Sequence, residues 1–287
     1  EHKTIDTCVG VWNALSELNA DRKSLIINLG GGVVTDLGAF VASTLKRGIQ
    51  YINVPTSLLA MVDASVGGKT GVDLGVLKNQ IGVINTGAMV LIDTSNLSTL
   101  PANELRSGYA EMLKHGLIQD ESYWTELLDL SNLTLKNLDN LIYKSVLIKN
   151  KVTTQDPNED GLRKTLNYGH TLGHAIESLF LEDNNKTTLL HGEAIAVGMV
   201  LATYISHKLL GFPKQKLDLI KLTMIDLYGK VVFHQTDYQK IINLLIYDKK
   251  NSHGNINFVL LNDIGSAKID CIVENSLILE AFDFYNK

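Results

Sequence analysis

The sequence has little cysteine, no long hydrophobic run and no excess of basic residues. Its 287 residues include two cysteines, Cys8 and Cys271, too far apart to suggest a disulfide framework or a thiolate zinc cluster, so we expect a cytoplasmic protein. The formal net charge of −5 argues against a general nucleic-acid binder. No apolar run reaches the roughly 18 residues of a transmembrane helix, and the closest, Ile195–Leu201, is interpreted as a core helix. Neither nucleic acid nor a membrane is an expected partner.

The rest of the composition is that of a folded globular protein, with 45% hydrophobic and 20% charged residues, and the length favours two domains. Short apolar runs predict strands at Ser24–Leu29, Ile49–Val54 and Ala88–Asp93. We predict an α/β domain over residues 1–102 and a helical domain over residues 103–287. Helices are expected over Asn103–Gln119, Ser122–Leu130, Leu135–Thr154, Lys164–Leu181, Leu189–Leu210 and Lys214–Leu227, and a hairpin over Asn257–Leu261 and Ala267–Ile272.

A glycine turn follows the first predicted strand and precedes a predicted helix. Strand, glycine turn and helix form the arrangement in which backbone N–H groups cradle a pyrophosphate. Gly30 and Gly32 match the first two glycines of the dinucleotide fingerprint, whereas Thr35 stands where the third would be. A plain tight turn is the alternative interpretation.

A second glycine-rich loop runs from Gly67 to Thr70. Its Gly-Lys-Thr sequence suggests a nucleotide P-loop, but that motif needs a glycine where Asp63 stands and a strand directly before it. We therefore reject the P-loop. The lysines, with Asn79 nearby, suit a small anionic ligand instead, and a solvated turn is the alternative.

Two histidines, His170 and His174, lie four residues apart in a predicted helix and therefore share one helical face, where they can hold a divalent metal ion. Gly169 and Gly173 leave a strip of small residues for a close neighbour or ligand. A catalytic zinc site uses three protein ligands and keeps one position open. Spacing selects the His170–His174 pair, with core histidines as the alternative, and does not decide among the other candidates, which are His191, Glu111, Glu177 and Glu193.

Basic residues accompany these helices, which suits an acidic, hydroxylated substrate; they are Lys114, Lys149, Arg163, Lys249 and Lys250. Each of them alone would be interpreted as part of a solvated helix face. Together with the glycine turn, they suggest a nucleotide, a metal and an acidic small molecule that meet between two domains.

These motifs jointly resemble the 3-dehydroquinate synthase family over the whole chain. They are Gly30–Asp36, Arg47-Gly48, Val54–Thr56, Val62-Asp63, Gly67–Thr70, Lys78-Asn79, Ala110-Glu111, Lys114, Gly161–Arg163, Asn167, Gly169-His170, Gly173–Glu177 and His191–Glu193. The resemblance implies a Rossmann-like NAD domain followed by an all-α domain. It also implies conversion of 3-deoxy-D-arabino-heptulosonate 7-phosphate to 3-dehydroquinate and phosphate, through transient oxidation by NAD, phosphate elimination, re-reduction and an intramolecular aldol.

The same resemblance implies roles for individual residues. The ligands of Zn²⁺ or Co²⁺ would be Glu111, His170 and His191, while His174 would bond the substrate, which differs from the pairing that spacing selects. NAD would contact Gly32, Val33, Val34, Thr35, Asp36, Thr56, Ser57, Lys69, Lys78, Asn96, Leu97, Ser98 and Thr99. The substrate would contact Asp63, Lys69, Asn79, Lys114, Lys149, Arg163, Asn167, His174, Lys250 (or Lys249) and, from the partner subunit of a homodimer, Arg47.

The sequence departs from the family pattern at Thr35 and Ser57, both small residues that we expect the cofactor site to tolerate. The family also has a further N-terminal segment, so we expect residues 1–287 to belong to a longer chain and to bind metal well but NAD poorly by themselves. Three rival functions stay open: a cyclase making 2-deoxy-scyllo-inosose or a valiolone, a metal-dependent polyol dehydrogenase, and a non-catalytic metal-binding protein.

Overall fold

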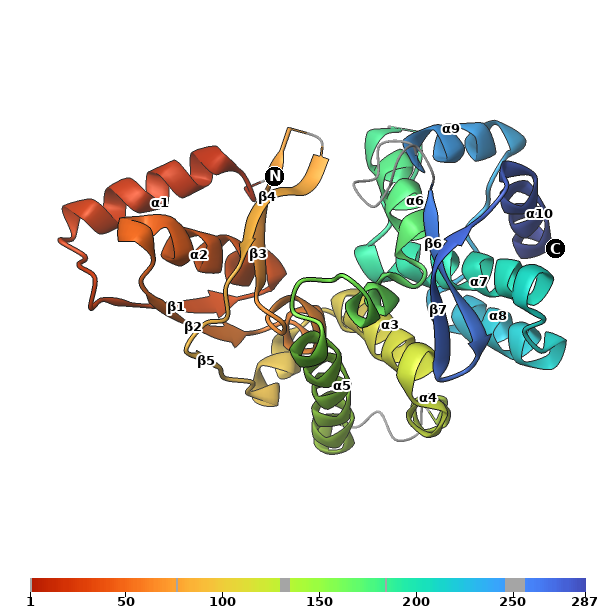
Figure 1. Ribbon diagram of the computed structural model, residues 1–287, viewed down its shortest axis with the longest axis horizontal. Helices are drawn as coiled ribbons and strands as arrows, with labels where there is room; N and C mark the ends of the chain where they lie inside the picture. The colour runs from red at the N-terminus through yellow and green to blue at the C-terminus, as the bar shows by residue number, and fades with distance from the viewer. Residues whose placement is uncertain (1, 76, 130–134, 184, 246–255) are drawn as a thin grey trace. The chain divides into compact units, whose positions relative to one another are not determined.

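The computed structural model describes residues 2–75, 77–129, 135–183, 185–245 and 256–287, which form two compact units (Figure 1). Unit 1 comprises Glu1–Gly108 and Asn132–Asn158, and unit 2 comprises Tyr109–Ser131 and Glu159–Lys287. The chain therefore leaves unit 1, returns to it for helix α5 (Leu135–Gln155) and leaves it again.

Unit 1 contains a parallel sheet with the strand order β1–β2–β5, in which β1 (Leu25–Gly30) lies at an edge. β1 pairs in register along all of β2 (Gln50–Pro55), and both strands lie where the apolar runs predicted strands. The third strand, β5, is much shorter than the predicted Ala88–Asp93. Only Met89 and Val90 pair with β2 before the chain continues into the 3₁₀ helix η3 (Thr94–Thr99).

Two helices, α1 (Ile5–Glu17) and α2 (Gly32–Thr44), pack on one side of this sheet, with α2 between α1 and the strands (Figure 1). Their contact buries Cys8 of α1 together with Phe40 and Val41 of α2. This core fixes the start of α2 directly after β1, which is the position of the glycine turn.

An antiparallel hairpin of β3 (Lys69–Leu74) and β4 (Leu77–Ile84) begins inside the predicted glycine-rich loop and was not predicted as strands. The strands pass close together at Gly71 and Gly82, where an added Cβ would lie 2.6 Å and 2.2 Å from backbone oxygen atoms. Close backbone approach therefore selects glycine here, and the alternation of apolar and polar residues that marks most strands is weak.

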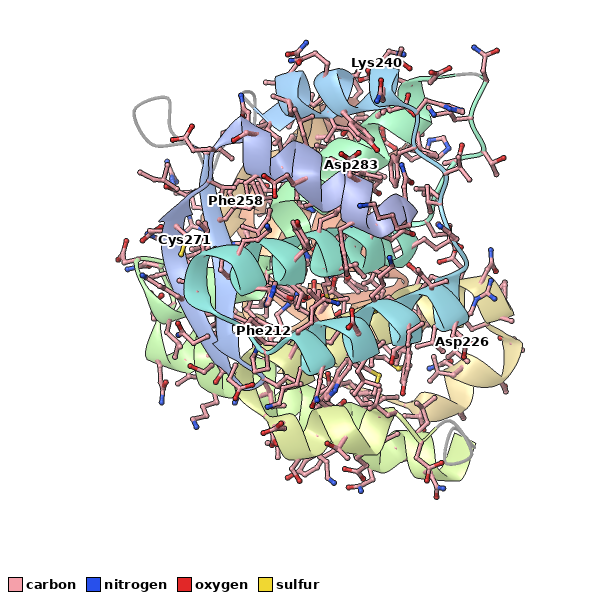
Figure 2. The ribbon with its side chains drawn as sticks, turned by 90° about the vertical axis from the view of Figure 1, so that its right-hand side faces the viewer. Phe212, Asp226, Lys240, Phe258, Cys271 and Asp283 are labelled. Carbon is pink, nitrogen blue, oxygen red and sulfur yellow. The ribbon has the colours of Figure 1, made fainter. Side chains whose placement is uncertain are left out.

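The described residues of unit 2 are helical apart from one hairpin, so the α/β-plus-helical architecture is confirmed. Its helices are α3 (Ala102–Gln119, which begins in unit 1), α4 (Glu121–Leu127), α6 (His170–Glu182), α7 (His191–Leu210), α8 (Lys214–Tyr228), α9 (Gln235–Leu245) and α10 (Asn275–Asn286). The hairpin of β6 (Asn257–Asp263) and β7 (Ser266–Ile272) was predicted from the sequence. Figure 2 shows α7 between two other helices. One is α10, which carries Asp283, and the other is α8, which carries Asp226.

Helix α7 is long and apolar enough to cross a membrane by length and composition, but 67% of its apolar window is buried inside the protein. It is packed by α6, α8, α10 and β6. The interpretation of Ile195–Leu201 as part of a core helix is therefore confirmed.

Candidate metal and cofactor site

Two helices of unit 2 begin with a histidine, His170 in α6 and His191 in α7. The prediction of one continuous helix over Lys164–Leu181 is wrong, because the chain forms a 3₁₀ helix η5 (Leu162–Asn167) and then the separate helix α6. The break occurs at Gly169, whose φ of +75° is left-handed and disfavours other residues. The break places the His170 ring at the first turn of α6.

Three imidazole rings come together at this place. The ring centroids of His170 and His174 are 5.2 Å apart, which confirms that the two residues share a helical face. The His191 centroid lies 5.7 Å from that of His170 and 5.8 Å from that of His174. One nitrogen from each ring lies within 4.8 Å of the others, so this cluster is a candidate metal centre.

Small residues let α6 and α7 approach closely enough to bring the rings together. An added Cβ on Gly198 of α7 would lie 2.0 Å from the carbonyl oxygen of Gly169, and one on Gly173 would lie 2.7 Å from Ile195 Cδ1. The strip of small residues predicted from Gly169 and Gly173 thus accommodates a close neighbour, which is helix α7. Gly198 belongs to the same contact but lies too far along the chain for local spacing to indicate it.

Of the three candidate carboxylates, Glu111 of α3 lies beside the histidine nitrogens. Its Oε1 is 3.3 Å from His170 Nε2 and 3.5 Å from His191 Nε2, and its other oxygen contacts the ammonium group of Lys114. Glu193 instead accepts a hydrogen bond from the backbone N–H of Leu190, at 2.8 Å, and caps α7. Glu177 lies on the other side of the His191 ring, with Oε2 3.4 Å from Nδ1.

The electrostatics of Glu111 favour the carboxylate form. Burial of this fully enclosed side chain opposes ionisation, but the positive charge of Lys114 and the contacts from His170 and His191 outweigh it and hold the pKa of Glu111 well below its usual range. Burial likewise tends to lower the pKa of His191, yet Glu111 and Glu177 raise that pKa to about 9.

These residues fit a divalent metal ion. Both carboxylate oxygens of Glu111 are buried and accept no hydrogen bond of good geometry within the described part of the chain. One carboxylate and two imidazoles are a donor set that Zn²⁺ or Co²⁺ accepts. The side chain of His191 is 24% exposed, so solvent reaches part of this cluster.

In unit 1, the glycine turn opens helix α2 as the sequence predicted. Gly31 is the N-cap residue and supplies no side-chain cap, so the first N–H groups of α2 are available to an anion. Thr35 is buried, and its hydroxyl donates to the carbonyl of Gly32 at 3.1 Å, which explains why a glycine is not needed at this position.

The close helix–strand approach that the third fingerprint glycine provides elsewhere occurs at Gly38, where an added Cβ would lie 1.9 Å from Asn28 Oδ1. Sequence reasoning missed Gly38 because the fingerprint spacing pointed to Thr35. The sequence did contain a signal for this contact, because Gly38 lies about one helical turn after Thr35 in the predicted helix.

Charged residues gather near the start of α2. The ammonium group of Lys3 forms an ion pair with the carboxylate of Asp36, with 2.5 Å between Nζ and Oδ2. It also donates a hydrogen bond to the side-chain oxygen of Asn79. Burial raises the pKa of Asp36, although Lys3 opposes that shift. In the same unit, the ammonium group of Lys149 contacts the carboxylate of Asp63 at 2.6 Å. Sequence reasoning missed Lys3, and no local pattern distinguishes it from a surface lysine.

The remaining predicted cofactor residues of unit 1 lie after β2, on the β3–β4 hairpin and in η3. Thr56 and Ser57 follow β2, and the backbone N–H of Thr56 donates to the carbonyl of Gly30 at 2.9 Å. Lys69 and Lys78 are exposed on the hairpin. The last four predicted contacts lie in η3; they are Asn96, Leu97, Ser98 and Thr99, of which Leu97 is buried.

The predicted substrate residues divide between the two units. In unit 2, Arg163 is buried in η5, and Asn167 donates to Glu159 at 2.9 Å. In unit 1, the exposed Arg47 has a left-handed φ of +70°, an unusual backbone conformation for a residue with a side chain. Lys249 and Lys250 lie outside the described residues.

Comparison with known proteins identifies relatives along the whole chain. Residues 1–107 match the family model of the 3-dehydroquinate synthase N-terminal region, and residues 108–251 match that of its C-terminal region. The 3-dehydroquinate synthase of Parabacteroides distasonis is 46% identical over 280 residues, which cover 96% of this chain and 78% of the relative. That of Ruminiclostridium cellulolyticum is 37% identical over 281 residues, covering 96% of this chain and 77% of the relative.

Solved structures with the same fold include sugar-phosphate cyclases. The 2-epi-5-epi-valiolone synthase of Streptomyces hygroscopicus, with NAD⁺ and Zn²⁺ bound, has a TM-score of 0.88 at 27% identity and covers 99% of this chain and 79% of its own. A 2-deoxy-scyllo-inosose synthase with carbaglucose-6-phosphate, NAD⁺ and Co²⁺ has a TM-score of 0.85 at 29% identity, covering 98% and 79%. With both family regions matched in sequence, this chain belongs to the 3-dehydroquinate synthase family.

Proposed function

We propose that this protein is a 3-dehydroquinate synthase, a phosphate-eliminating carbon–oxygen lyase that converts 3-deoxy-D-arabino-heptulosonate 7-phosphate to 3-dehydroquinate and phosphate. The observation that carries the proposal is the convergence of Glu111, His170 and His191 in a chain of this family. Acting in the shikimate pathway, the enzyme would work in the cytoplasm.

Glu111, His170 and His191 would hold the divalent ion, through one carboxylate oxygen of Glu111 and the Nε2 atoms of the two histidines. A bound Zn²⁺ or Co²⁺ supplies Lewis acidity that polarises substrate hydroxyl groups. Lys114 offsets the charge of Glu111, and His174 is the neighbouring ring that would donate to or accept from a substrate oxygen.

The N-terminus of α2 would bind the pyrophosphate of NAD through the N–H groups that no side chain caps. Bound NAD supplies a reversible hydride acceptor. Thr56 and Ser57 lie next to the turn, because the N–H of Thr56 is bonded to Gly30. Lys69, Lys78 and residues Asn96–Thr99 complete the proposed cofactor contacts.

The substrate would be held by charge. Arg163 and Asn167 of η5 suit its carboxylate and hydroxyl groups, because a planar guanidinium forms paired bonds to a carboxylate. Asp63 and Lys149, already ion-paired, would orient hydroxyls, while Lys69, Asn79 and His174 would bind phosphate, with Lys250 as a further contact. In a homodimer, Arg47 would add a cation to the phosphate site of the partner subunit.

The rival functions differ at defined points. A cyclase acting on a sugar phosphate that lacks a carboxylate offers no such group for the guanidinium of Arg163 to bind, so Arg163 and Asn167 suit the acid substrate better. A polyol dehydrogenase would release NADH. A purely structural metal site would be closed by four protein ligands, whereas the proposed set has three, which are Glu111, His170 and His191.

One assay tests the proposal. Phosphate release from 3-deoxy-D-arabino-heptulosonate 7-phosphate is measured for the wild-type protein with NAD, with and without a chelator, and after Zn²⁺ or Co²⁺ is restored. We expect release that the chelator abolishes and the metal restores. Release from a sugar phosphate that lacks a carboxylate, with none from the acid substrate, would assign the chain to a rival cyclase.

A further inference from the structure

One imidazole of the metal cluster has a carboxylate on each of its two nitrogens. Nε2 of His191 faces Glu111 Oε1 at 3.5 Å, and Nδ1 faces Glu177 Oε2 at 3.4 Å. The two nitrogens of an imidazole point away from each other. An ion bound at Nε2 between His191 and Glu111 is therefore out of reach of a carboxylate at Nδ1, and this geometry removes Glu177 from the candidate ligands.

The other predicted histidine ligand is oriented in a comparable way. Nδ1 of His170 lies 3.0 Å from the carbonyl oxygen of Tyr168, which can only accept a hydrogen bond, so Nδ1 carries the proton and Nε2 is the basic nitrogen. The acceptor for His170 is therefore a backbone carbonyl group only two residues away in the chain. His191 obtains its acceptor from the side chain of Glu177, on a different helix.

We propose that Glu177 is a positioning residue for the metal centre, accepting the Nδ1–H of His191 so that Nε2 is presented to the ion beside Glu111. The inference rests on the proposed metal centre and adds a residue to it. Glu177 follows His170 and His174 on α6, so one helix carries a ligand, a substrate-binding ring and the group that orients the ligand from α7.

The environment of this contact favours such a role over a solvated ion pair. The side chain of Glu177 is 11% exposed, and hydrogen bonds to a carboxylate are stronger where water is largely excluded. A carboxylate on the far nitrogen also makes the imidazole a better donor to a metal, and loss of such a partner typically lowers metal affinity about 10–100-fold.

The test compares Glu177→Ala and Glu177→Gln with Glu182→Ala, which removes an exposed carboxylate at the end of the same helix. Metal affinity is measured by competition with a chelator, and the visible absorption spectrum of the Co²⁺-loaded protein reports the ligand geometry. Unfolding midpoints of the metal-free proteins show whether each variant folds.

We expect Glu177→Ala to lower metal affinity about 10–100-fold and to alter the Co²⁺ spectrum. Glu177→Gln, whose amide oxygen can still accept the Nδ1–H, should retain much of both, and Glu182→Ala should match the wild type. A Glu177→Ala protein with wild-type affinity and spectrum would overturn the inference. A wild-type protein that binds no divalent ion would overturn the metal centre with it. Metal binding that depends on Glu177, without phosphate release, would overturn only the proposed reaction.

Discussion

At the scale of single residues, the contact made by one nitrogen of a histidine determines what the other nitrogen can bind. Tyr168 and Glu177 occupy the Nδ1 atoms of His170 and His191, and both Nε2 atoms then face Glu111. The i,i+4 pair that spacing selected shares a face, as expected. The carboxylate of Glu111 from α3 lies beside the Nε2 atoms of both His170 and His191, and the ligand set implied by the family resemblance stays a prediction.

Removing any one ligand should strip the metal. We expect Glu111→Gln, His170→Ala and His191→Ala to purify with far less than one divalent ion per chain, since each lacks one of three coordinating atoms. His174→Ala should keep the ion and lose activity. Elemental analysis decides this, and a metal-free His174→Ala protein beside a loaded His191→Ala protein would contradict the assignment.

The buried guanidinium of Arg163 should affect the substrate and not the cofactor. We expect Arg163→Ala to raise KM for the acid substrate about tenfold or more, because a charge-assisted contact contributes about 1.5–3 kcal/mol. NAD affinity, measured by calorimetry, should not change. Arg22→Ala, at an exposed position, is the matched control. An unchanged KM in Arg163→Ala would remove this residue from the substrate site.

At the scale of elements, the metal cluster depends on how closely α6 and α7 pack. The approach is set by glycines on both sides of the contact, and Gly198 leaves no room for a side chain beside the carbonyl of Gly169. Any change that separates the helices moves His191 away from His170 and Glu111. The helix contact and the metal site are therefore expected to fail together.

Gly198→Ala tests this dependence. Its Cβ would lie 2.0 Å from a backbone oxygen, so we expect a loss of about 3 kcal/mol or more of stability, together with weaker metal binding. Gly10→Ala is the matched control, because Gly10 lies within α1 and a Cβ there meets nothing within 4 Å. That variant should be more stable by about 0.5–1 kcal/mol. Urea denaturation distinguishes the two outcomes.

The stability contributed by the contacts at the N-terminus of helix α9 should depend on pH. The carboxylate of Asp237 accepts a hydrogen bond from the backbone N–H of His234 at 2.9 Å. It also forms an ion pair with the ammonium group of Lys186 at 2.9 Å. Burial raises the pKa of Asp237, but these two contacts outweigh it and leave the pKa below its usual value. A lowered carboxyl pKa stabilises the fold above the unfolded-state pKa of about 4, and the contribution disappears as pH falls through the folded-state pKa.

We therefore expect Asp237→Asn to cost about 1 kcal/mol at pH 7, with the difference from the wild type shrinking below about pH 4. Denaturation curves at several pH values measure it. Asp226→Asn, at an exposed position of α8, is the control variant. A cost in Asp237→Asn that stays constant at acid pH would show that the ion pair is not its source.

At the scale of the whole molecule, the chain passes between its two compact units more than once. The change from a strand pattern to a helical pattern predicted one boundary, after residue 102. The return of α5 to unit 1 places Lys149 next to Asp63. The functional division into a cofactor domain and a metal domain stays a prediction.

The proposed reaction should require NAD without consuming it, because hydride is removed and returned within one turnover. We expect phosphate release to continue with a catalytic amount of NAD and no build-up of absorbance from NADH. Accumulation of one NADH for each substrate converted would instead favour the polyol dehydrogenase. A reaction with Glu111→Gln protein under the same conditions is the control for contaminating activity.

The sequence by itself determined the features that depend on neighbouring residues. Apolar spacing predicted β1, β2 and most helices, the glycine turn was located before α2, and His170 and His174 were placed on one face. Local patterns also failed where backbone contacts replace side-chain packing, as in the β3–β4 hairpin with its paired glycines, and at Gly169, whose left-handed φ ends a continuous apolar pattern.

Only the tertiary structure decided which groups meet. Glu111, Glu177 and Glu193 are equally acidic in the sequence, yet one faces two Nε2 atoms, one orients a ring and one caps a helix. Gly38 and Gly198 likewise have a role only because another element passes within contact distance. Helical periodicity extends over a few residues, whereas a metal site needs atoms from α3, α6 and α7 within a few ångströms, and only the packing of whole helices brings them there.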